Sequence, residues 1–184
     1  APLRAKLETL VKQASPRYMG LDAKGGQLFA VYSDPKFQQP MIVVMGQDAD
    51  PTKARVVLDP NKLDPTGSTS FDWFVPSPDG ERIAVSLSKG GSEDGSLHVF
   101  DVATGQQVGD AIPRVQYPTA GGSAAWTPDG KGLWYTRYPG PDRPADEQHF
   151  HQTVWFHRLG EDPKADVQVF GVGLPEIAAI KLHY

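Results

Sequence analysis

Short runs of aromatic and β-branched residues recur along the chain, and turn sequences separate them. Residues 133–136 (Leu-Trp-Tyr-Thr) and 154–157 (Val-Trp-Phe-His) are two such runs. Residues of these types suit the pleated, half-buried surface of a β-strand. The turn Thr127-Pro128-Asp129-Gly130 supplies a fixed φ, an acceptor side chain and a positive φ in succession. The pattern predicts one four-stranded unit that begins near Ala124.

The same unit occurs earlier in the chain, so the sequence contains an internal repeat. Gly80 of a second Pro-Asp-Gly turn lies 50 positions before Gly130, and Gly25 of a weaker copy lies 55 positions before Gly80. A period of roughly 40 to 50 residues with four short strands is typical of β-propeller blades. The sequence therefore predicts an all-β fold, a partial β-propeller of about three to three and a half blades. The predicted blades are 17–69, 70–112 and 123–170, with the first strand of a further blade at 176–184.

The first 16 residues are predicted to form a helix and a lead-in to the propeller. Leucine and valine side chains of 2–13 fall on one helical face, and Ser15-Pro16 ends the pattern. The main interpretation is a packing helix that caps a sheet. A membrane-surface helix is the alternative.

Composition excludes several classes of protein. The formal charge is −4 and no basic block is present, which argues against nucleic acid as a partner. No apolar run approaches the roughly 18 to 20 residues of a membrane span, and residues 1–13 lack the apolar core of a signal peptide. The absence of cysteine rules out a disulfide scaffold but leaves the compartment open between cytoplasmic and periplasmic or secreted.

The sequence contains no complete catalytic motif. A nucleophile elbow requires Gly-x-Ser-x-Gly, whereas the segment 121–125 reads Gly-Gly-Ser-Ala-Ala and precedes a predicted strand rather than a helix. Neither Gly25-Gly26 nor Gly90-Gly91 is followed by the Lys-Ser or Lys-Thr of a phosphate loop. We therefore expect no catalytic residue and no cofactor in this chain.

Two histidines form the one pattern that could hold a metal. His149 and His151 alternate as strand neighbours would, with Asp146, Glu147 and His157 close in sequence. His-x-His without a third fixed ligand is a weak signal, because solvated histidines in an exposed loop look the same. The sequence predicts no metal site and leaves the role of both histidines open.

Several segments, in a fixed order, resemble the propeller domain of the prolyl oligopeptidase family of serine peptidases. The resemblance covers about 17–170, and its most distinctive piece is the Ala-Trp-Thr-Pro-Asp-Gly-Lys-Gly-Leu-Trp-Tyr-Thr-Arg-Tyr-Pro run at 125–139. The other matching pieces are Val57-Leu58-Asp59-Pro60-Asn61-Lys62-Leu63, Asp101-Val102-Ala103-Thr104-Gly105 and Phe156-His157-Arg158-Leu159-Gly160.

The resemblance implies a function for the chain as part of a larger protein. In that family a seven-bladed propeller covers an α/β-hydrolase domain with a Ser, Asp, His triad and restricts the active site to short peptides. By this resemblance the chain is the non-catalytic, substrate-gating portion of a peptidase that cleaves short proline-containing peptides. Four blades and the hydrolase domain, which would hold the peptide substrate, are missing. We expect no peptidase activity from the chain alone, and its exposed blade edges favour self-association.

A second interpretation belongs to another functional class. The chain could be a self-standing propeller-type module that binds a protein or a glycan through its blade rims or through the insertion at 139–152. An observed dimer whose edge strands complete each other's sheets would favour this module.

The resemblance also assigns a ligand role to one aromatic residue. Tyr117 falls where some family members place a propeller side chain that reaches toward the substrate, with Arg114 and Gln116 as polar neighbours. An aromatic ring can pack an apolar peptide side chain over a large area at low entropic cost. The alternative is a tyrosine packed beside its own blade.

Overall fold

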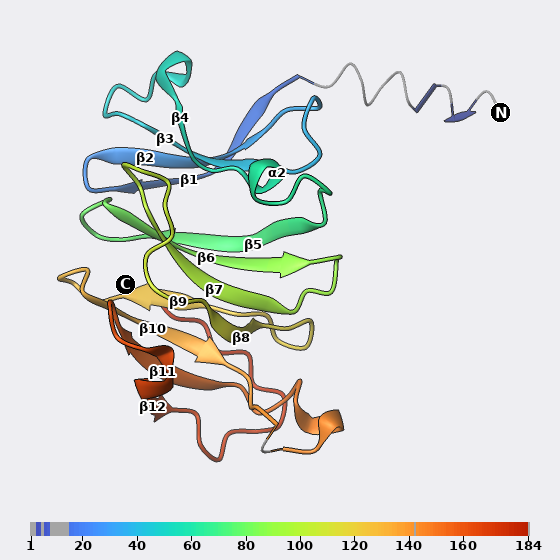
Figure 1. Ribbon diagram of the computed structural model, residues 1–184, viewed down its shortest axis with the longest axis vertical. Coiled ribbons are helices and arrows are strands. Elements are labelled where there is room, and N and C mark those ends of the chain that lie inside the picture. Colours follow the sequence, from blue (N-terminus) through green and yellow to red (C-terminus); the bar gives the residue numbers. More distant parts are fainter. Residues whose placement is uncertain (1–2, 5, 8–14, 142, 184) are drawn as a thin grey trace.

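The structure is a computed structural model, which describes residues 3–4, 6–7, 15–141 and 143–183. The described strands form three four-stranded antiparallel sheets, which follow one another in chain order (Figure 1). The predicted all-β class is confirmed. The helix predicted at 2–13 lies mostly outside the described residues.

Each sheet is formed by four strands that are consecutive in the sequence. The first sheet contains β1 (Arg17–Lys24), β2 (Gln27–Ser33), β3 (Met41–Met45) and β4 (Arg55–Leu58). The second contains β5 (Thr69–Pro76), β6 (Arg82–Lys89), β7 (Gly95–Asp101) and β8 (Ile112–Gln116). The third contains β9 (Ala124–Trp126), β10 (Gly132–Arg137), β11 (Thr153–Arg158) and β12 (Val167–Phe170). The second unit therefore extends past the predicted boundary at Ile112, because β8 pairs with β7.

The predicted Pro-Asp-Gly turns connect the first two strands of the second and third sheets. In the second sheet the Asp79 carboxylate accepts hydrogen bonds from the Ser77 hydroxyl (2.5 Å) and the Glu81 N–H (3.0 Å). In the third sheet Asp129 accepts the equivalent bonds from Thr127 (2.7 Å) and from the Lys131 N–H (3.1 Å). We call the end of the sheets with the connections 25–26, 77–81 and 127–131 the turn end.

The turns of neighbouring sheets lie against each other at the turn end. A Cβ added to Gly25, which has a φ of +56°, would lie 1.8 Å from the carbonyl oxygen of Asp79. A Cβ on Gly80 would lie 2.9 Å from the carbonyl oxygen of Lys24. Only glycine combines a positive φ with so close a backbone approach, so the first two sheets meet here main chain to main chain.

Two hydrophobic clusters fill the spaces between the sheets. The first joins side chains of the first and second sheets, among them Phe29, Ile42 and Phe100. The second joins the second and third sheets around Leu97, Trp126 and Tyr135. The Trp126 indole N–H also donates to the carbonyl oxygen of Val75 (2.9 Å), which connects the third sheet to the second. Burial of these faces holds the three sheets in one body.

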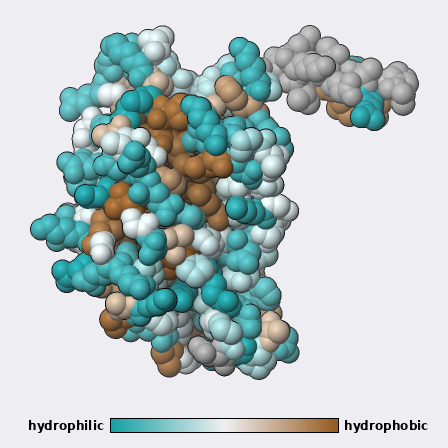
Figure 2. All heavy atoms as spheres, viewed as in Figure 1, coloured by the Kyte–Doolittle hydropathy of each residue, from teal (hydrophilic) through white to brown (hydrophobic). Residues whose placement is uncertain are grey.

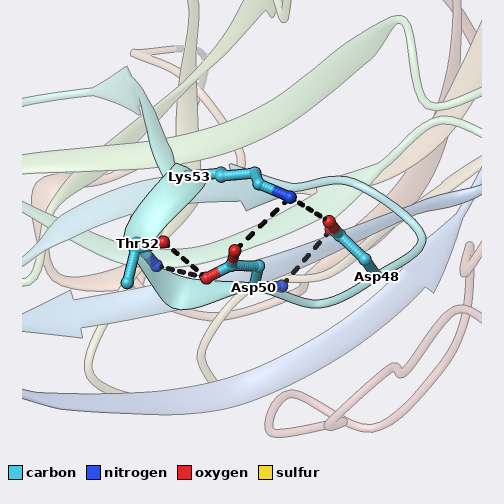
Figure 3. A network of polar contacts seen from close by, with 4 residues as sticks. All are labelled: Asp48, Asp50, Thr52 and Lys53. Atoms are coloured by element: carbon cyan, nitrogen blue, oxygen red, sulfur yellow. Dashed lines mark hydrogen bonds and ion pairs between the residues drawn. The ribbon is translucent and has the colours of Figure 1, made fainter.

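Three Asp-Pro pairs begin short helical turns between strands. The turns are η1 (Pro51–Lys53), α2 (Pro60–Leu63) and η3 (Pro163–Ala165), and in each the aspartate caps the backbone N–H two residues later. The α2 turn spans four residues, which are too few for a helical pattern to be seen in the sequence. Figure 3 shows the η1 turn, where Lys53 Nζ lies 2.6 Å from Asp48 Oδ2 and 3.4 Å from Asp50 Oδ2. A further short helical turn, η2 (Ala145–Glu147), lies in the long connection between β10 and β11.

The predicted strand at 176–184 is not formed within the described residues. Its backbone instead binds side chains of the third sheet, since the Ile180 N–H donates to Gln152 Oε1 (3.2 Å) and the Leu182 N–H to Ser123 Oγ (2.9 Å). Leu182 also lines a cavity together with the three residues of β9. The segment therefore runs beside the inner strand of the third sheet without pairing with it.

Apolar side chains remain on the surface. Figure 2 shows them gathered on the visible face over the first and second sheets, among mostly hydrophilic residues. All four residues of β12 are exposed, including Val167 at 60% and Phe170 at 59%. The outer strands β4 and β8 contain buried residues, because β4 contacts β7 and β8 contacts β10. β12 is thus the outer strand with no described sheet against it.

Candidate functional site

The opposite end of the sheets carries the longest connection between the described strands and most of the described non-glycine residues with a positive φ. We call it the loop end, and it includes the connections 34–40, 90–94 and 138–152. Three non-glycine residues there have a positive φ: Glu93 (+55°), Arg114 (+66°) and His151 (+57°). Non-glycine residues in this conformation cost free energy and concentrate where surrounding contacts enforce them, often at functional sites. The loop end between the second and third sheets is therefore the candidate site.

Tyr117 lies at the centre of this candidate site. Its ring packs edge-on against Tyr138 (5.0 Å between centroids) and His149 (4.7 Å), and the residue is 7% exposed. Burial, followed by the neighbouring Asp94 carboxylate, raises the pKa of the Tyr117 phenol above its ordinary value, while Arg114 acts to lower it. The ring thus packs on residues of the connection between β10 and β11 of the third sheet, although Tyr117 itself follows β8 of the second. The substrate contact stays a prediction.

Arg114 connects the second sheet to the insertion at 138–152. Its Nε donates to the carbonyl oxygen of Pro139 (2.7 Å) and its Nη2 to Gln148 Oε1 (3.2 Å), while the Tyr138 N–H donates to the Arg114 carbonyl (2.9 Å). Gln116, the other predicted polar neighbour, accepts a hydrogen bond from the Trp73 indole N–H (3.1 Å) instead. The strained backbone of Arg114 is therefore held by three hydrogen bonds across the junction.

A second group of hydrogen bonds converges on Gly121. Its carbonyl oxygen accepts from the Tyr138 hydroxyl (2.8 Å) and from Gln152 Nε2 (2.8 Å), and the Gln152 side chain is buried. Ser123, the serine of the incomplete elbow, uses its hydroxyl oxygen to accept the Leu182 N–H (2.9 Å). Ser123 thus serves as an acceptor for the backbone of the C-terminal segment.

The side chains of the two histidines in the insertion contact different residues. His149 packs on Tyr117, whereas His151 Nε2 lies 3.9 Å from Glu147 Oε2. No group of three or more His, Cys, Asp or Glu residues in the described part of the chain could hold a metal ion. Among the same residues, no helix is both long and apolar enough to span a membrane.

The sequence did not reveal a buried polar group in the third sheet. His157 Nδ1 lies 2.7 Å from Asp166 Oδ1, and the Tyr135 hydroxyl donates to Asp166 Oδ2 (2.8 Å). The His157 and Asp166 side chains are only 7% and 2% exposed. Burial and then Asp166 raise the pKa of Tyr135 well above its ordinary value, while Arg137 acts to lower it. Strand alternation could have indicated that Tyr135 and His157 share a face of the sheet. Leu133 is buried, Tyr135 lies two residues after it on the same face of β10, and His157 pairs with Leu133 from β11.

Comparison with known proteins places this architecture in a family. The model of the prolyl oligopeptidase N-terminal β-propeller domain matches residues 3–181. This chain belongs to the prolyl oligopeptidase family. A prolyl endopeptidase from Elizabethkingia miricola is 29% identical over 127 residues, which are 65% of this chain and 16% of that protein. The resemblance seen in the sequence is thereby confirmed.

Solved structures of family members share the fold. One comes from a study of two prolyl endopeptidases and the role of inter-domain dynamics in catalysis and specificity. It matches this chain with a TM-score of 0.79 and 26% identity, and the match covers 91% of this chain and 24% of the solved one. Prolyl oligopeptidase B from Galerina marginata, solved with a 25mer macrocyclization substrate, has a TM-score of 0.73 and 19% identity over 92% of this chain and 26% of its own. The chain therefore spans about a quarter or less of these relatives.

Proposed function

We propose that this chain is the substrate-gating portion of a prolyl-oligopeptidase-like serine peptidase and supplies no catalytic residue itself. The three sheets are then three consecutive blades of a β-propeller. An α/β-hydrolase domain outside this chain performs the cleavage of short proline-containing peptides. Steric selection is the mechanism, because the propeller leaves room for a short, flexible peptide and none for a folded protein.

The observation that carries this proposal is the uncovered third sheet. β4 is covered by β7 and β8 by β10, so each outer strand packs on the next sheet in the series. β12 repeats the position of β4 and β8 in sheet order but exposes all of its residues. A further sheet packed on β12 would bury Val167 and Phe170 and continue the series, as a larger propeller requires.

The relatives support the same proposal. They are several times longer than this chain, and one of them was solved with a 25mer macrocyclization substrate bound. Tyr117 would contribute to the gate as an aromatic surface for an apolar peptide side chain. To do so its ring would have to gain exposure, because Tyr138 and His149 now cover it.

The test starts from the native protein, isolated from its source cells with an antibody against this chain. We expect a mass much greater than the 20.0 kDa of the chain. The isolated protein should cleave a short proline-containing peptide but not the same peptide embedded in a folded carrier protein. The purified 184-residue chain should cleave neither.

Three outcomes would contradict the proposal. Turnover by the purified chain would place catalysis within it. Equal cleavage of the free and the embedded peptide would remove the gate. A native mass near 20.0 kDa would favour the self-standing binding module, and sedimentation of that species would show whether its edge strands pair between copies.

A further inference from the structure

A cleft of about 560 Å³ opens at the loop end of the third sheet. Its walls come from β10, β11 and β12, from the insertion and from residues 171–174, and the inner strand β9 contributes no lining residue. Gly140 and Gly173 line it with bare backbone, and a Cβ added to either would meet nothing within 4 Å. The cleft therefore lies on the outer half of the sheet and is open enough for a ligand of a few residues.

Among the described residues that line this cleft, the charged side chains are basic. They are Arg137 and Arg143, and none of the described lining residues is acidic, although the whole chain carries a formal charge of −4. Glu147 lies 2.7 Å from Arg143 Nη1 and so neutralises part of that charge. No carboxylate of the described residues pairs with Arg137 within 4.0 Å. Arg137 is the cation that remains for an anionic ligand.

The surroundings of Arg137 hold its guanidinium in place. The guanidinium lies over the Trp155 ring, 5.0 Å from its centroid, and the Trp155 indole N–H is fixed by Thr153 Oγ1 (2.9 Å). Arg137 also interacts with Tyr135, whose hydroxyl donates to the buried Asp166 carboxylate. A stacked guanidinium keeps its edge for a bidentate carboxylate, and a preformed position lowers the entropic cost of binding.

We propose that this cleft binds a carboxylate of a peptide, with Arg137 as the bidentate anchor. The lining favours a peptide over a bare anion, because Pro139, Pro141 and Leu174 add apolar walls that phosphate would leave unused. The site is a second peptide contact on the outer half of the sheet. It does not depend on the gate, and it would exist whether or not a hydrolase domain follows.

The test is a calorimetric titration of the purified 184-residue chain, whose result does not depend on catalysis. Three peptide probes are used: acetyl-Leu-Glu-Leu amide, its Gln counterpart, and acetyl-Leu-Leu-Leu with a free C-terminal carboxylate. We expect at least one acid to bind about tenfold more tightly than the Gln peptide, the size of a charge-assisted hydrogen bond. The stronger of the two acids identifies the carboxylate as side-chain or C-terminal. Equal binding of the Gln peptide, no binding of any peptide, or equally tight binding of inorganic phosphate would overturn the proposal.

Matched variants assign the binding to Arg137. Arg137→Gln should weaken binding about tenfold, while Arg158→Gln should leave it unchanged, since Arg158 is exposed, lies 3.6 Å from Glu161 and is outside the cleft. Gln168→Glu adds a negative charge to the cleft on the exposed strand β12 and should weaken binding without disturbing the fold. Equal losses in the Arg137 and Arg158 variants, or unchanged binding by the Gln168 variant, would contradict the site.

Discussion

The two Pro-Asp-Gly turns and the loop-end junction between the second and third sheets differ in how far apart their hydrogen-bonding partners lie in the sequence. In the turns, Ser77 with Asp79 and Thr127 with Asp129 are two positions apart. At the junction, Arg114 binds Pro139 and Gln152 binds Gly121, over separations of 25 and 31 residues. The turns can therefore form from local sequence, whereas the junction requires sheets that have already packed.

The largest effect is expected at the turn end, from Gly25→Ala. The new Cβ would meet the Asp79 carbonyl oxygen at 1.8 Å in a residue with a φ of +56°. Overpacking and backbone strain together should reduce the free energy of unfolding by about 3 kcal/mol. Urea denaturation of the purified chain measures this change.

Gly90→Ala is the matched control for this substitution. Gly90 has a φ of +63°, but a Cβ there would meet nothing within 4 Å. Only the backbone strain remains, and it should cost about 1 kcal/mol. Equal effects of the two substitutions would show that the sheets do not meet main chain to main chain at Gly25.

An intermediate effect is expected at the loop end, from Arg114→Ala. The alanine keeps the positive φ but loses the hydrogen bonds to Pro139 and Gln148, which should destabilise the chain by about 1 to 2 kcal/mol. The insertion should also loosen, so a glutamate-specific protease should cut after Glu147 faster while the sheets stay intact. Arg114→Gly loses the same bonds but relieves the strain, and should be about 1 kcal/mol more stable than the alanine variant. An unchanged rate of cleavage after Glu147 would mean that Arg114 does not hold the insertion.

The smallest expected effects concern the stability of the fold at acidic pH. Hydrogen bonds, first from the Ser68 hydroxyl, hold the pKa of Asp64 at the loop end well below its ordinary value. Hydrogen bonds, first from the Thr127 hydroxyl, lower the pKa of Asp129 at the turn end. A lowered folded-state pKa adds stability that is present above the ordinary aspartate pKa of about 4 and is lost as the pH falls through the folded-state value.

Asp64→Asn and Asp129→Asn should each reduce the amount of stability that is lost as the pH falls. The Asp64 change should be the greater, because Asp64 accepts bonds from Thr66, Ser68 and Thr69. Thermal midpoints between about pH 2.5 and 7 give the comparison. If the thermal midpoint of the Asp64→Asn variant falls below about pH 4 as steeply as that of the unsubstituted chain, Asp64 does not contribute to the acid sensitivity.

The sequence predicted those parts of the fold that local chemistry determines. The Pro-Asp-Gly turns and the aromatic and β-branched runs beside them are local signals, and they correctly indicated three repeated units. The predicted end of the second unit, at Ile112, was too early, because β8 continues through Pro113 to Gln116. Residues 176–183 form no paired strand, because apolar alternation does not reveal whether a pairing strand is available.

The candidate site was less accessible to prediction than the fold. Tyr117 came from the family resemblance, and its packing on His149 depends on an insertion 32 positions later in the sequence. No signal in the sequence connected Asp166 with His157 and Tyr135, and only the folded sheet brings its carboxylate to them. Residues that meet through long connections leave no periodic signal in the sequence.

The main-chain contact at Gly25 also determines how the sheets respond to changes in their cores. The spacing between the first and second sheets at the turn end is set by backbone van der Waals radii, which substitutions in the hydrophobic cluster between these two sheets do not alter. A larger or smaller side chain in that cluster must therefore be accommodated farther along the strands, by a small rotation that opens or closes the loop end between the two sheets. Core volume thus acts as an angular adjustment on the connections 34–40 and 90–94, without a change in either connection.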